Sequence, residues 1–220
     1  MRYLFSQNNQ FPFISELCVM ACNNTVIDLC DTGNLPGTPF RDTRNMFPML
    51  WRFFPTLDPQ VDIYLSRDLD SRFSLREVSA VTDWLTNSVE PIHVMRDNMM
   101  HDIPMIGCSW GAHLERKNAR WHWVKSWSDI MRDPITFSPR SVKGPDQVVL
   151  AKYVWSWGRC NSLQHDSYTC QIFPGTRPFP TQRPIEPNNF IGAISVSNGT
   201  YLTPCPKLCR PKLHQHWTYC

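Results

Sequence analysis

No run of apolar residues in this sequence reaches the roughly 18 residues that a helix needs to cross a bilayer. No run of five basic residues appears either, and the formal net charge is only +3. The first absence excludes a transmembrane span in this sequence, and the second argues against binding to nucleic acid. Internal repeats and low-complexity segments are also lacking, so we do not expect a repeat architecture.

The chain does have the composition of a folded globular protein. Hydrophobic residues make up 42% of its 220 residues and charged residues 19%, which suffices for a sizeable core in one large or two small domains. Nineteen prolines and nine tryptophans are high counts. They predict a loop-rich surface with flat platforms suited to sugar rings, although any single tryptophan is more simply explained as part of the core.

Nine cysteines indicate an oxidising compartment, where disulfides persist. They gather near the two chain ends, at positions 18, 22 and 30 and at 160, 170, 205, 209 and 220, with Cys108 alone between them. We expect disulfide loops in both clusters and Cys108 as the odd free thiol. Zinc is the alternative, but Cys18-x3-Cys22 and Cys205-x3-Cys209 do not match the usual Cys-x2-Cys spacing.

Two N-glycosylation sequons, Asn23-Asn24-Thr25 and Asn198-Gly199-Thr200, agree with passage through the secretory pathway. The opening residues MRYLFSQNNQ contain no signal-peptide core, which disagrees with that route. We therefore expect the Golgi lumen or the extracellular space as the location, and a chain that is N-terminally truncated or has lost its leader.

Strands are expected to alternate with helices through the middle of the chain, because runs rich in β-branched and aromatic residues alternate with helical periodicity. A capping box from Ser74 to Glu77 marks the clearest helix start. The alternation predicts an α/β fold, whose ligands bind beyond the carboxyl ends of the strands. The expected strands cover 61–66, 92–95 and 103–114, and the expected helices 46–54, 75–85, 120–133 and 145–157.

Composition divides the chain into three parts. Residues 1–45 are turn-rich, contain three cysteines and show no opening apolar strand followed by a helix. Residues 46–170 hold the expected α/β core. Proline and cysteine dominate residues 171–220, where we expect an irregular C-terminal extension tied by disulfides.

The stretch VDIYLSRDLDSRFSLREV, residues 61–78, carries two aspartates at the end of an expected strand. Side chains two residues apart on an extended backbone point the same way, so Asp68 and Asp70 should repel each other unless a cation neutralises them. Mg²⁺ and Mn²⁺ take oxygen ligands and bridge carboxylates to substrate phosphates, which makes a divalent metal site one interpretation. A salt-bridge cluster with Arg67 and Arg72 is the other.

Four segments carry motifs in a characteristic order: WRFFPTLDPQVDIYLSRDLDS at 51–71, HVMRDNMMHDIPMIGCSWGA at 93–112, KGPDQVVL at 143–150 and HDSY at 165–168. The set resembles the nucleotide-sugar site of glycosyltransferases with the GT-A fold. Its Asp-Gln resembles that of the retaining family that includes glycogenin and lipopolysaccharide galactosyltransferases. The second segment is similar to a stretch of bacterial and invertebrate glycosyltransferase-like proteins. The resemblance implies a GT-A-like mixed, mostly parallel sheet flanked by helices.

The resemblance also implies a metal site. Asp68 and Asp70 would hold Mn²⁺ or Mg²⁺ together with the diphosphate of the donor. His165 would be the third protein ligand, and Arg52 would contact the donor. The simpler alternatives are a surface role for Arg52 and a hydrogen-bonded pair of His165 with Asp166 in a turn.

Four further residues take roles near the transferred sugar under the same resemblance. Gly107 and Gly111 would let the backbone approach the sugar, and Asp146 and Gln147 would line the transfer centre. Gly107 could instead serve a bend. Asp146 follows Pro145 in the first turn of an expected helix, where the helix dipole favours an acidic residue in any case.

A metal-dependent glycosyltransferase is therefore the leading functional expectation. It would move a sugar from a nucleotide-sugar donor, with a UDP-sugar favoured, to a glycan or protein acceptor. The first alternative is a secreted, disulfide-stapled binding domain that has lost catalysis. The second is a phosphatase with an Asp-x-Asp nucleophile, for which we find no matching downstream lysine and acidic pair.

Two features depart from the family pattern. Only 67 residues precede Asp68, which leaves little chain for the units that hold the nucleotide base. Ser66 and Arg67 stand before Asp68, where a Leu-Asp-x-Asp form is commoner. We therefore expect an incomplete base pocket and weakened nucleotide binding.

Overall fold

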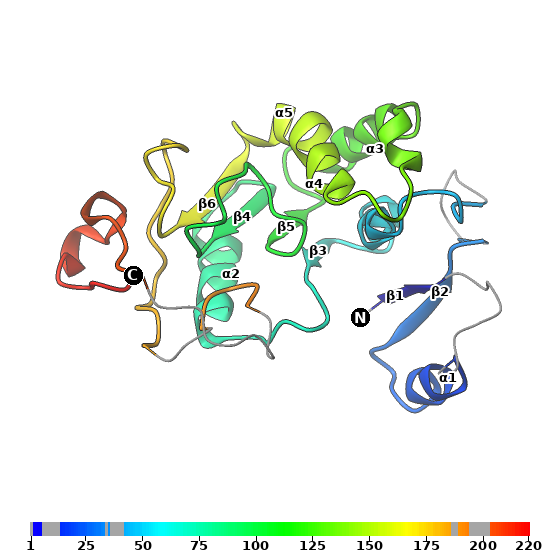
Figure 1. Ribbon diagram of the computed structural model, residues 1–220, viewed down its shortest axis with the longest axis horizontal. Helices are drawn as coiled ribbons and strands as arrows, with labels where there is room; N and C mark the ends of the chain where they lie inside the picture. The colour runs from blue at the N-terminus through cyan, green and yellow to red at the C-terminus, as the bar shows by residue number, and fades with distance from the viewer. Residues whose placement is uncertain (1, 6–13, 34, 36–41, 186–188, 194–202) are drawn as a thin grey trace.

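The computed structural model describes residues 2–5, 14–33, 35, 42–185, 189–193 and 203–220 (Figure 1). Its centre is a four-stranded mixed sheet in the spatial order β3-β5-β4-β6. The strands are β3 Ile63–Ser66, β4 Ile92–Arg96, β5 Trp110–His113 and β6 Ser162–Asp166. The expected α/β class, with a mixed sheet flanked by helices, is confirmed.

β5 runs against both of its neighbours. It pairs antiparallel with β3 and with β4, whereas β4 and β6 pair in parallel. Three of the four strands share one direction, and the reversed strand β5 makes both antiparallel pairings. The cause is the segment 97–109, which returns beside β4 without a crossover helix, and such a return makes an antiparallel pair.

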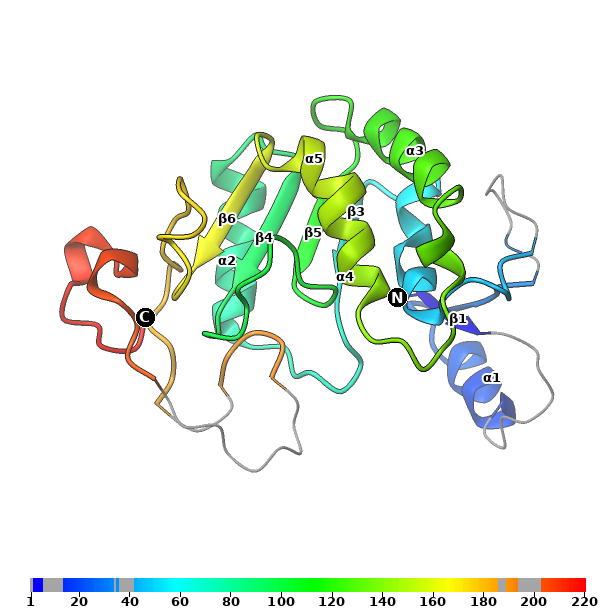
Figure 2. The same ribbon diagram turned by 45° about the horizontal axis from the view of Figure 1, so that its top comes forward.

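Helices cover both faces of the sheet (Figure 2). On one face lies α2, Leu75–Asn87, whose Trp84 stacks on His93 of β4 with 5.2 Å between ring centroids. Across the other face pack η1, α3 and a continuous helical stretch made of α4, η3 and α5. Their bounds are Pro48–Leu57, Ala119–Ile130, Pro145–Val149, Leu150–Val154 and Trp155–Gly158. Among the described helices, none has the length and hydropathy needed to cross a membrane.

The expected start of α2 is confirmed, with one difference in the cap. Ser74 is the N-cap, and its hydroxyl accepts a hydrogen bond from the Glu77 amide at 3.2 Å. The Glu77 carboxylate lies 3.0 Å from the Arg67 guanidinium, in a buried contact without hydrogen-bond alignment. Burial raises the pKa of Glu77 to about 7, against the lowering effect of Arg67. Arg67 is thereby held away from the aspartates that follow it.

The N-terminal segment is a β-α-β unit, and the expectation that it lacks an opening strand and helix is wrong. β1 Arg2–Phe5 pairs in parallel with β2 Asp28–Asp31, and α1 Ile14–Cys22 connects them. The two-stranded sheet lies apart from the four-stranded one (Figure 1). Each strand has only four residues, too short for alternation along the sequence to stand out.

Tryptophans fill the main core, as expected for single residues of this type. Trp84, Trp110, Trp123 and Trp127 are completely or almost completely buried. Trp110 of β5 stacks on Trp123 of α3 at 5.2 Å, which joins the sheet to the helices on that face. Trp121, on the opposite side of α3 from Trp123, is 59% exposed.

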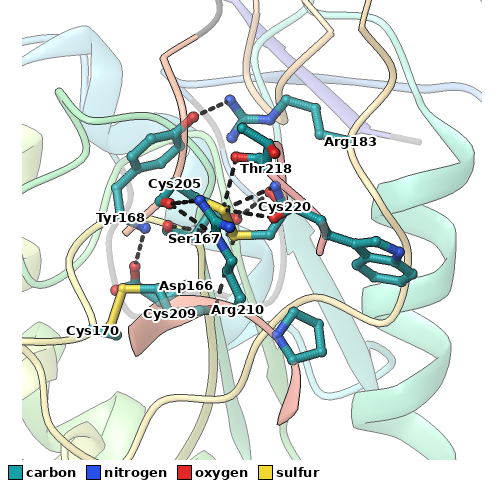
Figure 3. Close-up of a disulfide and its surroundings, with 12 residues drawn as sticks. Asp166, Ser167, Tyr168, Cys170, Arg183, Cys205, Cys209, Arg210, Thr218 and Cys220 are labelled. Atoms are coloured by element: carbon teal, nitrogen blue, oxygen red, sulfur yellow. Dashed lines mark hydrogen bonds between the residues drawn. A yellow bond between two sulfur atoms is a disulfide. The ribbon is translucent and has the colours of Figure 1, made fainter. Parts of the chain in front are cut away.

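Two disulfides tie the C-terminal extension (Figure 3), which confirms the expected loops at that end. Cys170 bonds Cys209, and Cys205 bonds Cys220. Among described residues, this extension has only the 3₁₀ turns η4 Lys207–Cys209 and η5 Lys212–His214 as regular elements.

The N-terminal cysteine cluster does not form the expected disulfide loop. Cys18 and Cys22 are exposed on α1, Cys30 lies half-buried on β2, and none of the three is in a disulfide. Cys160 is exposed and free, and Cys108 is a buried free thiol, as expected. The sequon at Asn23 is exposed just after α1, whereas the sequon at 198–200 lies outside the described residues.

A buried ion cluster anchors the extension to the sheet. Asp97 directly follows β4 and receives the guanidinium groups of Arg76 and Arg183 at 2.9 Å and 2.6 Å. The Ser167 hydroxyl, just after β6, lies 3.0 Å from the Asp97 carboxylate and 2.9 Å from the Cys220 carbonyl oxygen. The Ile191 amide donates to Asp97 at 3.0 Å. One carboxylate thus joins α2, the ends of two strands and the C-terminal segments.

Candidate functional site

A cavity of about 290 Å³ lies beyond the carboxyl end of β3. Its wall is built from segments far apart in the sequence: η1, the turn after β3, the approach to β5 and the start of α4. Five residues that the sequence singled out line it together, namely Arg52, Asp68, Gly107, Asp146 and Gln147. The cavity is therefore the first candidate for a ligand site in this chain.

Arg52 is the electrostatic centre of this cavity. Its guanidinium donates to the Asp68 carboxylate at 2.6 Å and lies 3.9 Å from the Asp146 carboxylate. Burial raises the pKa of Asp146, and the charge of Arg52 opposes that rise. The partner that neutralises Asp68 is thus Arg52, whereas Arg67 contacts Glu77.

Gly107 is a close-approach position, as expected, but its neighbour is a protein group. A Cβ at this position would lie 2.6 Å from Oδ2 of Asp146, closer than carbon and oxygen pack. The Gly107 carbonyl oxygen accepts from the Ser66 hydroxyl at 2.5 Å and from Arg52 at 3.3 Å. The glycine allows the 105–108 segment to lie against the start of α4 and so closes the cavity.

Gly107→Ala is therefore expected to displace the Asp146 carboxylate and lower the free energy of unfolding by about 1–3 kcal/mol, the usual cost of overpacking. Gly158→Ala is the matched control. Its Cβ would meet nothing nearer than Ile92 at 3.7 Å, and alanine suits a helix better than glycine. Urea unfolding of both variants measures the difference, and equal stability would remove the argument for close packing at residue 107.

Gly111 serves packing inside the sheet. It lies in β5, where a Cβ would lie 2.7 Å from Leu65 and 3.2 Å from Trp84. The missing side chain lets α2 approach the strands. Gly111 does not line either described cavity, so its expected approach to a sugar finds no support.

Asp70 follows Asp68 through a turn and not along an extended strand. β3 ends at Ser66, and the Ser71 amide donates to the Asp68 carbonyl at 3.3 Å. Asp70 is exposed, whereas Asp68 is half-buried. The argument that both side chains point the same way on extended backbone is therefore wrong, although both still line one larger cavity.

That larger cavity, about 1330 Å³, adjoins the first one. The two share Met49, Arg52 and Asp68 in their walls. The Arg52–Asp68 ion pair thus stands between a small polar compartment and a large one with a mainly apolar wall.

His165 is fully engaged elsewhere. It lies in β6, where its Nδ1 is 2.8 Å from Nε2 of His93 and its Nε2 is 3.2 Å from the Asp83 carboxylate. Burial lowers the pKa of His165 to about 4, against the raising effect of Asp83. The ring lines neither described cavity, so the structure does not bring it to Asp68 and Asp70. Its partner is also not Asp166, the alternative that the sequence offered.

The described residues contain no group of three His, Cys, Asp or Glu side chains arranged to hold a metal ion. Mg²⁺, however, commonly binds through one or two carboxylates and completes its shell with substrate phosphates and water. Asp68 and Asp70 line one cavity and fit that smaller requirement. The residues therefore fit a cation that arrives with a diphosphate ligand, but not the expected protein triad with His165.

Two further residues of the small cavity were not predicted as site residues. Lys143 and Cys108 both line it. Burial raises the pKa of Cys108 to about 12, helped by the nearby charge of Asp68, so this thiol stays protonated. The lysine follows a turn-rich stretch, and only the folding of 142–147 over the cavity brings it to the site.

Comparison with protein-family models, with curated proteins and with solved structures finds no match to this chain. The functional argument therefore rests on the site itself. Its elements are a polar cavity, a guanidinium between two carboxylates, and an adjoining larger cavity with a second acidic residue.

Proposed function

We propose that this chain is a glycosyltransferase-like protein whose small cavity takes the sugar diphosphate part of a nucleotide-sugar donor, with a UDP-sugar favoured. One observation carries the proposal: Arg52, Asp68, Gly107, Asp146 and Gln147, separated by up to 95 positions in the sequence, line the same 290 Å³ cavity. The acceptor would be a glycan or a protein. The proposed location is the Golgi lumen or the outside of the cell, and the two disulfides are compatible with either.

The charges of the cavity suit a diphosphate leaving group. Arg52 and Lys143 bring guanidinium and ammonium groups to its wall, and both groups bind phosphate oxygens. A divalent cation, Mn²⁺ or Mg²⁺, bound at Asp68 and Asp70 would neutralise charge that develops on the diphosphate.

Asp146 is suited to take the acceptor's proton. In the transfer, a bond forms between the acceptor oxygen and the sugar carbon, the bond from that carbon to the diphosphate oxygen breaks, and the hydroxyl proton leaves. A carboxylate whose pKa is raised by burial is a better base than an exposed one. The Gln147 amide can donate to and accept from hydroxyl groups of the sugar.

Thermal unfolding with UDP-glucose, UDP-galactose or UDP-N-acetylglucosamine, each with and without Mn²⁺, tests the donor site. A ligand at about 100 times its Kd adds about 2.7 kcal/mol of stability. We expect this gain only when cation and nucleotide-sugar are both present. Asp68→Asn should abolish this gain in stability, whereas Asp129→Asn, at an exposed position of α3, should keep it. No gain with any of the three donors would refute the proposal.

A catalytically inactive binding domain is the second candidate, and one observation favours it. Arg52 already pairs with Asp68 and approaches Asp146, so an internal cation satisfies carboxylates that a transferase would leave to its ligand. Asp146→Asn separates the two. A transferase should lose donor hydrolysis and transfer in this variant while keeping the thermal gain. A binding domain should show the thermal gain but no turnover, both in the parent protein and in Asp146→Asn.

A further inference from the structure

β3 is an edge strand, and no described strand pairs with its outer side. In the described sheet it pairs only with β5. The Leu114 amide donates to the Asp62 carbonyl at 2.7 Å, which makes residues 62 and 114 a hydrogen-bonded pair of this antiparallel ladder. Such pairs alternate along a ladder, so residues 64 and 66 also bond to β5, and the amide and carbonyl groups of Ile63 and Leu65 point away from it.

The outer edge of β3 lies in a groove. Ile63, Tyr64 and Leu65 line the 1330 Å³ cavity together with η1 on one side and the 67–73 segment on the other. The walls carry apolar groups, including Pro55, Leu69 and Phe73. Ile63 and Leu65 are 44% and 39% exposed there, although strand residues of this type are usually covered.

Two charged groups beside the strand, Arg67 and Asp68, are already paired within the chain. Arg67 contacts Glu77 at 3.0 Å, and Asp68 is bound by Arg52 at 2.6 Å. An occupant of the groove therefore does not need a countercharge for either. It needs donors and acceptors for the backbone of Ile63 and Leu65, and apolar surface for the walls. An extended backbone with apolar side chains supplies both.

We propose that this groove binds an extended peptide segment, which adds to β3 as a fifth strand. The complementarity lies in the backbone dipoles that β3 presents and in the apolar walls beside them. The groove also continues into the polar cavity through the shared Arg52–Asp68 wall, so one end of a bound segment would reach that site. The binding itself does not depend on the proposed transfer reaction.

The concave surroundings favour a single extended segment over a second copy of the chain. In a symmetric dimer of β3 strands, each strand would have to enter the groove of the other while carrying its own η1 and 67–73 walls. A single peptide has no such walls. The occupant is therefore expected to be a partner segment with apolar residues at alternate positions, which place their side chains on one face of the strand.

The probe is the blocked peptide acetyl-KTITVTK-amide, added to the whole protein without nucleotide or metal. Nuclear magnetic resonance should show slower hydrogen exchange, by about tenfold or more, at the Ile63 and Leu65 amides and not at Tyr64. The same peptide N-methylated at alternate amides cannot complete the ladder and should bind at least about tenfold more weakly, a difference of about 1.4 kcal/mol.

Two variants separate strand addition from adhesion to an apolar surface. Leu65→Pro removes one outward amide and leaves the bonds of residues 64 and 66 to β5, as proline is tolerated on edge strands. It should abolish binding. Leu65→Thr keeps the amide and should retain binding within a few fold. Near-ultraviolet circular dichroism from Tyr64 and Trp110, whose rings lie 5.1 Å apart, reports whether β3 stays paired.

Three results would overturn the inference. The first is no binding of the peptide at millimolar concentration. The second is equal binding of the methylated peptide, which would indicate adhesion to the walls. The third is protection of the Ile63 and Leu65 amides without peptide in a protein that sediments as a dimer, which would assign the groove to a second copy. None of these results bears on donor binding, which is measured separately with UDP-sugars.

Discussion

Asp97→Asn is expected to lower the free energy of unfolding by about 3–5 kcal/mol, the usual cost of removing one partner of a buried ion pair. Asp97 is completely buried, and Arg76 and Arg183, which bind it, are only 2% and 5% exposed. The charges of both arginines hold the pKa of Asp97 below its usual range although burial opposes them. Asparagine leaves two buried guanidinium groups without a counterion.

The matched control is a second Asp–Arg pair in the same chain. Asp129 and Arg132 lie 3.0 Å apart on α3, with side chains 43% and 72% exposed. Asp129→Asn should cost less than about 1 kcal/mol, because water and salt screen exposed pairs. Urea unfolding of both variants gives the comparison. A loss at Asp97 as small as that at Asp129 would mean that water reaches the cluster.

The same substitution should loosen the C-terminal extension first. Asp97 accepts from the Ile191 amide, and Ser167 links it to the carbonyl of Cys220. Limited proteolysis of the folded variant should therefore cut within 181–185 and 189–193 faster than in the parent. The disulfides at Cys170 and Cys205 hold the end of the chain but not this middle part.

Local signals in the sequence predicted the local parts of the fold. The Ser74 cap of α2 could be predicted because a cap depends on residues only three positions apart in the sequence. The strand at 61–66 and the helix at 145–157 were likewise found from short patterns. The direction of β5 was not predictable in this way, because it depends on how the 97–109 segment returns and not on composition.

The site was only partly predictable for the same reason. Arg52, Asp68 and Asp146 were singled out through motifs, and folding does bring them to one cavity. His165 was placed there by its order in the chain alone. The parallel pairing of β4 with β6 instead sets it across from Met95, with its ring among His93 and Asp83 on the α2 side. No sequence pattern separates these two outcomes.

The buried histidines predict a marked loss of stability in mild acid. Burial lowers the pKa of His93 well below its usual value, with a smaller effect of His165, and lowers those of His165 and His101 to about 4. The neighbours fit neutral rings. The Asp97 amide donates to Nδ1 of His101 at 3.2 Å. When Nε2 of His165 donates to Asp83, Nδ1 of His165 accepts from Nε2 of His93. Protonating an acceptor nitrogen, Nδ1 of His165 or Nδ1 of His101, would break the hydrogen bond that it accepts.

The unfolded chain protonates these rings below about pH 6.5, whereas the folded chain resists protonation of His101 and His165 until about pH 4. In that window the unfolded state binds more protons at the three rings, whereas the folded state binds one more at Glu77, whose pKa burial raises to about 7. Three histidines outweigh one glutamate, so the free energy of unfolding should fall as the pH falls. His101 and His165 each contribute up to about 3 kcal/mol across the window, at 1.36 kcal/mol per pKa unit. Urea unfolding between about pH 7 and about pH 4.5 measures the slope of the free energy of unfolding against pH.

His165→Gln should reduce this slope by the equivalent of about one bound proton, because glutamine does not titrate. Replacing the exposed His216 should leave the slope unchanged. A stability independent of pH in this window would mean that the folded chain takes up as many protons as the unfolded chain, which would contradict the burial of neutral rings at His93 and His165.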